Sequence, residues 1–376
     1  MECYFDNSAT TKVCDLAVGE IYPLLTENYG NPASLHKKGD EAKAALDLAR
    51  ANVAKALSCN PDEVYFTSGG TESNNIAIFG AVEALKRRGN KIITTAIEHP
   101  SVSNAMARLE RQGFEVVRLP VDKFGKINEM DLYREVNRKT ILISIMLVNN
   151  EVGSIQPINS ARRAVNRAGS PALIHCDAVQ AFGKISVTPY DLGVDMISVS
   201  AHKVHGPKGV GALYVRKGVR IVSPVYGGDQ EDGIRSGTSP MPAIAGFGAA
   251  VTEFKQQDVT MARIKAFRDN FVKRILVLPE VHINSSSESL PYIINLSVEG
   301  IPSEVMRNEL SLRGVYVSSG SACSKGHRSS VLKSMKLPNS RIDSALRISL
   351  SRYTTQEEMD YLAESIFEAR NKFLNL

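Results

Sequence analysis

The 376-residue sequence has no tryptophan and few cysteines, and neither sign of charge dominates it. The cysteines are odd in number and widely spaced, and they form no C-x-x-C pair: Cys3, Cys14, Cys59, Cys176 and Cys323. This spacing argues against a disulfide framework and against a zinc site, so no metal site is predicted. Reduced thiols in a reducing compartment fit the pattern best.

The sequence shows no pattern of a leader, a membrane span or a basic tract, so none of them is expected. Its first residues, MECYFDNSATT, contain no basic region followed by an apolar one, and the longest apolar run, 141–148, is far too short for a bilayer. The net charge is +5, with 45 basic residues scattered among 40 acidic ones. These features predict a cytoplasmic protein that acts on a small molecule, with no membrane partner and no direct contact with nucleic acid.

Short β-rich runs alternate with amphipathic stretches between about residues 60 and 215. The alternation predicts an α/β domain with a large, mostly parallel sheet flanked by helices. Strands are expected at 63–67, 91–96, 115–119, 141–148, 172–176, 195–200 and 211–215, and helices at 73–88 and 102–113.

The composition changes after about residue 256, where a charged helical segment begins. Strands are expected at 292–298, 315–319 and 345–350, with helices at 261–278, at 303–312 and after Thr355. The last helix opens with two threonines followed by Glu357-Glu358, which is a capping-box signature. We predict a large domain over 16–256 and a smaller α+β domain made of 1–15 and 257–376, because chain termini often lie close together.

Two short stretches carry groups that could bind a charged ligand. TSGGTESNN, at 67–75, follows a strand and opens a helix, so Gly69 and Gly70 could let a phosphate approach the helix N-terminus. A tight turn is the alternative. Asp177 ends an apolar strand, where parallel sheets face their ligands, and its carboxylate could pair with a protonated pyridine nitrogen. An N-cap aspartate is the alternative there.

A lysine follows another strand in SVSAHKVHGPKG, at 198–209. Most lysines are solvated surface charges. Lys203, however, lies beside Ser200 and His202, which can donate to an anion, and ahead of a glycine-proline turn. A lysine in a partly desolvated pocket has a lowered pKa and can form a Schiff base. Together with Asp177 and the glycine turn, it provides what pyridoxal phosphate (PLP) requires.

A series of motifs then appears in register: SGGTESNN, IEHPSV, NNEVGSIQP, HCDAVQAFGK, SAHKVHGPKGVGALYV, RSGT and SSGSACS. From DNSATT near the N-terminus to RYTTQEE near the C-terminus, the chain resembles the NifS/IscS-like cysteine desulfurases of the class V aminotransferase family. The resemblance implies the PLP-dependent transferase fold, also called aminotransferase fold type I. It also implies PLP as the cofactor and L-cysteine as the substrate.

The same resemblance implies roles for individual residues. Lys203 would bind PLP covalently, and Asp177 would pair with the pyridinium nitrogen. Gln180 would bond the phenolic oxygen, and His99 would stack on the ring and help move protons. The phosphate would be held by Gly70, Thr71, Ser200 and His202, and by Thr238 of the neighbouring subunit, which implies a homodimer. Arg347 would bind the substrate α-carboxylate with help from Asn150.

Cys323 lies in SSGSACSKGHRSS, at 318–330, a run without apolar periodicity that predicts a mobile loop. Lys325, His327 and Arg328 are close in sequence and would favour its thiolate. The resemblance implies that this thiolate takes the sulfur of L-cysteine as a persulfide, leaving L-alanine. Whether Cys323 also ligates a transient iron–sulfur cluster stays open.

Several alternatives remain from the sequence. A selenocysteine lyase or a class V aminotransferase would share the fold, and an inactive homologue would act as a scaffold. A structural α/β protein would bind no cofactor. The sulfur acceptor also stays open: an iron–sulfur scaffold, a tRNA-thiolating enzyme, and the thiamine and molybdenum-cofactor pathways are all compatible. The departures SLSR at 349–352 and SPMP at 239–242 from the family pattern bear on that choice of partner.

Overall fold

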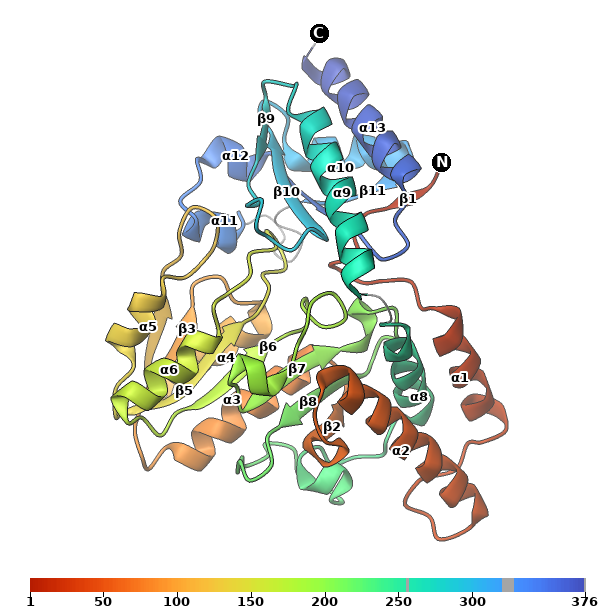
Figure 1. The fold of residues 1–376 in the computed structure, drawn as a ribbon, viewed down its shortest axis with the longest axis vertical. Coiled ribbons are helices and arrows are strands. Elements are labelled where there is room, and N and C mark those ends of the chain that lie inside the picture. Colours follow the sequence, from red (N-terminus) through yellow and green to blue (C-terminus); the bar gives the residue numbers. More distant parts are fainter. Residues whose placement is uncertain (255–256, 320–327, 375–376) are drawn as a thin grey trace.

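A computed structural model describes residues 1–254, 257–319 and 328–374 (Figure 1). Its lower part is built on a seven-stranded sheet in the order β2-β8-β7-β6-β5-β3-β4. The strands are β2 (Val64–Thr67), β3 (Lys91–Thr95), β4 (Glu115–Leu119), β5 (Thr140–Met146), β6 (Leu173–Asp177), β7 (Met196–Ser200) and β8 (Gly211–Val215). Only β8 runs antiparallel to its neighbours. Every residue of β5 and β7 is buried, as expected for strands covered on both faces.

Helices cover this sheet and extend beyond its β2 end (Figure 1). They are α1 (Asp15–Thr26), α2 (Lys37–Leu57), α3 (Gly70–Leu85), α4 (Pro100–Arg111), α5 (Glu129–Glu135), α6 (Asn159–Ala168), α7 (Pro189–Leu192) and α8 (Met241–Ala250). Helix α3 crosses the sheet and packs against several of its strands, while α8 packs between α1 and α2. Because α3 begins directly after β2, its N-terminus lies at the carboxyl edge of the sheet.

The upper part holds a four-stranded antiparallel sheet in the order β12-β13-β10-β9. Its strands are β9 (Val281–Ile283), β10 (Ile293–Val298), β12 (Ser318–Ser319) and β13 (Ala345–Ser349). The helices around it are α9 (Gln257–Ile275), α10 (Ser303–Leu312), α11 (Ser330–Ser334), α12 (Asn339–Asp343) and α13 (Gln356–Leu374). The N-terminus joins this part, because β1 (Cys3–Tyr4) pairs in parallel with β11 (Val315–Tyr316).

The fold class expected from the sequence is confirmed, since each predicted strand overlaps an observed one. Helix α3 begins at Gly70, three residues before its predicted start, because the glycine turn itself supplies the first turn. Helix α9 begins at Gln257 and ends three residues short of the predicted boundary. The capping box of α13 is present, with Thr355 N donating to Glu358 Oε2 at 2.8 Å and Glu358 N donating to Thr355 Oγ1 at 3.3 Å. The division into two domains stays a prediction.

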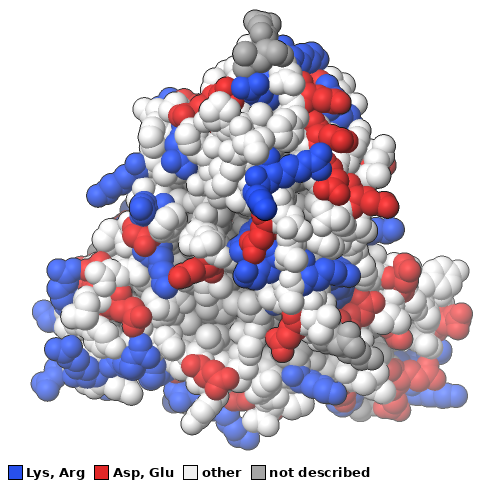
Figure 2. All heavy atoms as spheres, turned by 45° about the horizontal axis from the view of Figure 1, so that its top comes forward, with Lys and Arg blue, Asp and Glu red and all other residues white. Residues whose placement is uncertain are grey.

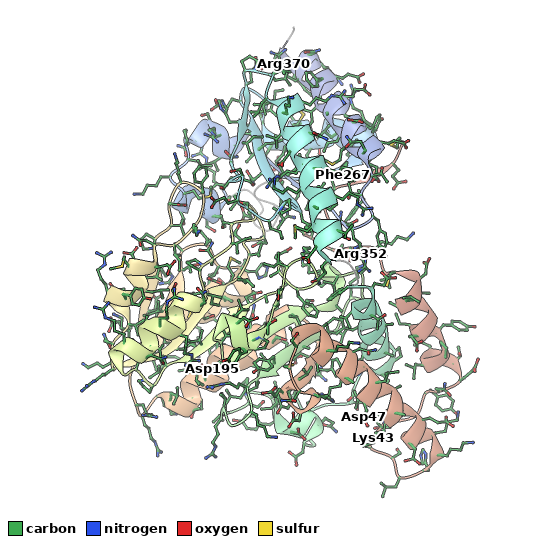
Figure 3. The ribbon with its side chains drawn as sticks, in the orientation of Figure 1. Lys43, Asp47, Asp195, Phe267, Arg352 and Arg370 are labelled. Atoms are coloured by element: carbon green, nitrogen blue, oxygen red, sulfur yellow. The ribbon has the colours of Figure 1, made fainter. Side chains whose placement is uncertain are left out.

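Charge is paired within the fold and mixed on its surface. Asp195, labelled in Figure 3, is fully buried next to β7 and bonds both Arg162 and Arg216, at 2.7 and 2.6 Å. On the face shown in Figure 2, lysine and arginine are interspersed with aspartate and glutamate. Within the described ranges, no helix is both long and apolar enough to cross a membrane.

Candidate active site

The polar residues predicted to act together meet at the carboxyl edge of the large sheet. Strands β2, β3, β5, β6 and β7 all end at this edge, and each is followed by a loop that carries such residues. They line a cavity of about 440 Å³, which lies within the range of about 300–1,000 Å³ typical of small-molecule sites. Strand β13 and the segment after β1 close the cavity from the upper part through Arg347, Asp6, Ser8 and Ala9.

Asp177 forms the floor of the cavity at the end of β6. One carboxylate oxygen accepts from Asn74 Nδ2 at 2.8 Å, and the other accepts from the backbone N of Val179 at 3.0 Å. The second bond is the turn-capping contact that the alternative interpretation expected. Because Asp177 also lines the cavity, its carboxylate caps the turn and still faces a ligand.

His99, at the N-cap of α4, forms a side wall. Its Nδ1 accepts from the backbone N–H of Ser101 at 3.2 Å and lies 2.9 Å from Ser101 Oγ. Because a backbone N–H can only donate, the proton of the neutral ring resides on Nε2. Burial lowers the pKa of His99, opposed by the charge of Asp177 and assisted by that of Lys203. The ring is therefore neutral at neutral pH.

Lys203 enters the cavity from the short 3₁₀ turn that follows β7. Its Nζ donates to the backbone oxygens of Ser8 and Ala9, the latter at 2.7 Å. Ser8 O also accepts from Gln180 Nε2 at 3.0 Å. The N-terminal segment thus joins the lysine after β7 to the glutamine after β6.

Donors for an anion gather where β2 passes into α3. Gly70 and Thr71 form the first turn of α3, whose backbone N–H groups have no partner within the helix. Ser200 and His202 face the same corner of the cavity. Burial, together with nearby lysines, lowers the pKa of His202 to about 4, so its ring is neutral at pH 7 and can donate through one nitrogen only.

Arg347 approaches from β13 and is buried. Its Nη2 donates to Asp6 Oδ1 at 2.8 Å and its Nη1 donates to the backbone oxygen of Asn150 at 3.2 Å. Its Nε is buried without a hydrogen-bond partner. Arg347 also lines the cavity, so its guanidinium is suited to a ligand carboxylate.

Most of the predicted site residues line this one cavity: Gly70, Thr71, His99, Asn150, Asp177, Gln180, Ser200, His202, Lys203 and Arg347. Thr238 does not line it and is exposed. Cys323, Lys325 and His327 lie outside the described residues. Arg328 pairs with Asp343, because its Nε and Nη2 each lie 2.6 Å from that carboxylate, and its influence on Cys323 stays a prediction.

Sequence reasoning missed three polar residues that organise the cavity: Asp6, Asn74 and Ser101. Asn74 lies one helical turn after Gly70 and therefore shares its face of α3. Its Nδ2 donates to both Asp177 and Ser101, which links α3, β6 and α4. The i, i+4 spacing from Gly70 was the available signal for Asn74, whereas no local pattern indicated the Asp6–Arg347 pair.

Glu98 is a buried carboxyl behind His99, and it gives a testable dependence of stability on pH. Its Oε1 accepts from Thr95 Oγ1 at 2.7 Å and from Met146 N at 3.0 Å, while its Oε2 has no partner. Burial raises the pKa of Glu98 to about 8. Between about pH 5 and 8 the native protein therefore holds a proton that the unfolded chain releases, so the free energy of unfolding falls as pH rises.

Glu98→Gln is expected to remove this fall, because an amide resembles the protonated carboxyl. The difference between wild type and variant should change by up to about 1.4 kcal/mol per pH unit. Denaturant unfolding at several values between about pH 5 and 9 measures it. Glu83→Gln, on the exposed face of α3, is the control and should keep the wild-type slope. Parallel stability curves for wild type and Glu98→Gln would contradict the assignment of a buried, protonated Glu98.

Comparison with known proteins places this geometry in context. The family model described as aminotransferase class-V matches residues 3–362. The chain is 40% identical over 380 residues to a Methanosarcina thermophila protein named cysteine desulfurase IscS, covering 99% of this chain and 93% of that protein. A solved structure described as a NifS-like protein matches with a TM-score of 0.93 and 39% identity, with 100% of each chain covered. The structure of SspA in complex with cysteine matches with a TM-score of 0.83 and 34% identity, covering 94% of this chain and 100% of that one.

Proposed function

Because the chain belongs to the class V aminotransferase family and is a cysteine desulfurase, we propose that its cavity holds PLP on Lys203 and that Cys323 takes the sulfur of L-cysteine. The single observation that carries this proposal is the meeting of Lys203, Asp177 and Arg347 in one cavity. An amine, a carboxylate and a guanidinium are the groups needed for an aldehyde cofactor, its ring nitrogen and an amino-acid carboxylate.

The residues around the cavity fit PLP, the cofactor of this family. A Cβ on Gly70 would lie 2.7 Å from Val179 Cγ2, so a side chain at this position would force Val179 to move. The space beside it faces the N-terminus of α3, where a phosphate is favoured. Asp177 supplies a buried carboxylate already oriented by Asn74. The cavity therefore holds a helix N-terminus that favours an anion, the carboxylate of Asp177 and the amine of Lys203 within one small volume.

In this proposal Lys203 binds the cofactor, Asp177 faces its ring nitrogen and Gln180 faces its phenolic oxygen. His99 covers the ring, and the first turn of α3 with Ser200 and His202 holds the phosphate. When bound, PLP supplies an electron sink for the substrate carbon. Asp177 keeps that sink effective, because a carboxylate favours the protonated form of the ring nitrogen.

Arg347 positions the substrate through its α-carboxylate. The guanidinium lines the cavity and can donate to a carboxylate there. Its bonds to Asp6 Oδ1 and to the backbone oxygen of Asn150 help to fix its plane.

Cys323 would then accept the sulfur. Its thiolate forms a bond to the substrate sulfur as the carbon–sulfur bond breaks, and the carbon keeps the electron pair and is protonated to give alanine. The persulfide left on Cys323 passes to an acceptor protein. We propose a partner that carries its own thiol, such as an iron–sulfur scaffold or a tRNA-thiolating enzyme, since a persulfide is transferred by attack of a second thiolate.

The proposed enzyme is a homodimer in which Thr238 reaches the phosphate of the neighbouring subunit. Thr238 is exposed in the single chain, as such a role requires. Helix α1 and the segment that follows it also expose large apolar side chains that a partner could cover: Leu16, Val18, Tyr22, Leu25, Tyr29 and Leu35.

Thr238→Val is expected to weaken PLP binding about tenfold or more, because one hydrogen bond to a charged group is lost. Titration of the apoenzyme with PLP measures the affinity, and sedimentation measures the dimer. Thr252→Val is the control, since this hydroxyl bonds Ala249 O within its own chain. A protein that is a monomer at working concentration, with full PLP affinity, would contradict the proposed role of Thr238.

The activity itself is tested by incubating the purified protein with L-cysteine and dithiothreitol. Equal amounts of alanine and sulfide are the expected products. Turnover of L-selenocysteine alone would indicate a selenocysteine lyase, and amino transfer without sulfide would indicate an aminotransferase. A protein that binds PLP and turns over none of these substrates would be a scaffold homologue.

A further inference from the structure

Lys184 is a half-buried lysine behind the cavity. It follows the turn after β6, and its Nζ donates to the backbone oxygen of Gln180 at 3.1 Å and to Gln180 Oε1 at 3.3 Å. Both acceptors are neutral, and no carboxylate of the described residues forms an ion pair with Lys184. An ammonium that is drawn partly out of water and meets only neutral acceptors destabilises a fold, so its presence points to a role in the site.

Among the groups near Lys184 is a second amine, that of Lys203. Lys184 and Lys203 line the same small cavity, together with His205, Arg352 and Tyr292. Arg352, labelled where the upper and lower parts meet in Figure 3, is paired with Glu253. Burial lowers the pKa of His205 to about 4 and raises the pKa of Tyr292 to about 12, so both are neutral at pH 7.

Two further basic groups lie on the same connection after β7. His202 is neutral, since its pKa is lowered to about 4. Lys208 is exposed and donates to Thr11 O at 3.3 Å, so water and that carbonyl screen its charge. The electrostatic partner of Lys184 that remains is therefore Lys203.

Gln180 connects the two lysines. Its Oε1 faces Lys184, which has only donors, and its Nε2 donates to Ser8 O, which also accepts from Lys203. An amide has one oxygen and one nitrogen end, so a donor at Oε1 fixes which end turns toward the cavity. Lys184 thereby keeps the N–H end of Gln180 available to an acceptor in the cavity.

We propose that Lys184 is a positioning residue for the cofactor site: it orients the Gln180 amide toward the phenolic oxygen and disfavours a second positive charge on the Lys203 nitrogen. The inference rests on the proposed function, in which Lys203 carries PLP. A neighbouring cation lowers the proton affinity of a lysine nitrogen and makes it more nucleophilic. Burial and then the charge of Lys203 lower the pKa of Lys184 to about 7, so Lys184 acts as a cation on Lys203 below about pH 7, where its amine is charged.

The test is a pH titration of the visible absorption of the holoenzyme without substrate, for wild type, Lys184→Met and Lys184→Arg. In Lys184→Met the midpoint is expected to rise by about one pH unit, a tenfold gain in proton affinity. Lys184→Arg keeps a positive charge and a donor, and its midpoint should stay at or below that of wild type. An unchanged midpoint in Lys184→Met would overturn the proposal.

Two controls separate this result from general damage and from failure of the proposed function. Lys208→Met removes a nearby but exposed lysine and should leave the midpoint unchanged. Lys184→Gln replaces Lys184→Met if the latter loses PLP, and a wild-type midpoint in Lys184→Gln would equally overturn the inference. A wild-type protein that shows no visible band with PLP would instead contradict the cofactor proposal, whatever the variants do.

Discussion

Cys323→Ala is expected to release neither alanine nor sulfide from L-cysteine at a measurable rate, a loss on the order of 10³-fold or more. The reason is that the proposed reaction needs a thiolate to accept the sulfur, and alanine offers no nucleophile. The cofactor band should remain, because no residue assigned to PLP is changed. Alanine and sulfide release are measured beside the visible spectrum of the same samples.

Cys59→Ala is the matched control for this variant. Cys59 is partly exposed, but burial raises the pKa of its thiol to about 12, so it stays protonated and unreactive at neutral pH. Its replacement should leave both products at the wild-type rate. Desulfuration that survives in Cys323→Ala would show that another group accepts the sulfur and would refute the proposed role of Cys323.

Lys203→Ala is expected to lose covalently bound cofactor together with activity, again by about 10³-fold or more. Borohydride reduction followed by mass spectrometry measures the covalent attachment directly: the wild type should gain the mass of one reduced PLP, and the variant should not. Lys203→Arg keeps a cation near the Ser8 and Ala9 carbonyls and still cannot bind PLP covalently, so it separates the charge from the chemistry.

The mass spectrum also decides which amine reacts. If Lys203→Ala still gained one reduced PLP, peptide mapping would locate the modified residue, and the assignment of Lys203 would be wrong. Lys184 is the nearby half-buried amine that such a result would implicate.

The site residues that lie at strand ends could be predicted from the sequence, because each of them directly follows an apolar run that marks the strand. Asp177 and Lys203 each come directly after an apolar run, and parallel strands bring such positions to one edge. The same reasoning located Gly70, whereas His99 came from the family resemblance. Their grouping in one cavity follows from the order of the strands in the sheet.

The contacts that cross from one part of the chain to another could not be predicted in this way. Asp6 bonds Arg347 across 341 residues of sequence, and Ser8 bonds Lys203 across 195. No periodicity or spacing in the sequence predicts that the residues of either pair are in contact. The pairing of Arg328 with Asp343 depends on the placement of α12, which again no local pattern fixes. The burial that raises the pKa of Glu98 and lowers the pKa of Lys184 is likewise a product of tertiary packing.

The contact between Asp6 and Arg347 also determines when, during synthesis of the chain, the cavity can be completed. Synthesis at roughly 5–20 residues per second means that Asp6 is made roughly 20–70 s before Arg347. Throughout that interval the N-terminal segment lacks strand β13, against which it packs. The last wall of the cavity is therefore added near the end of translation, and the arginine proposed to bind the substrate is made only after every residue proposed to bind the cofactor.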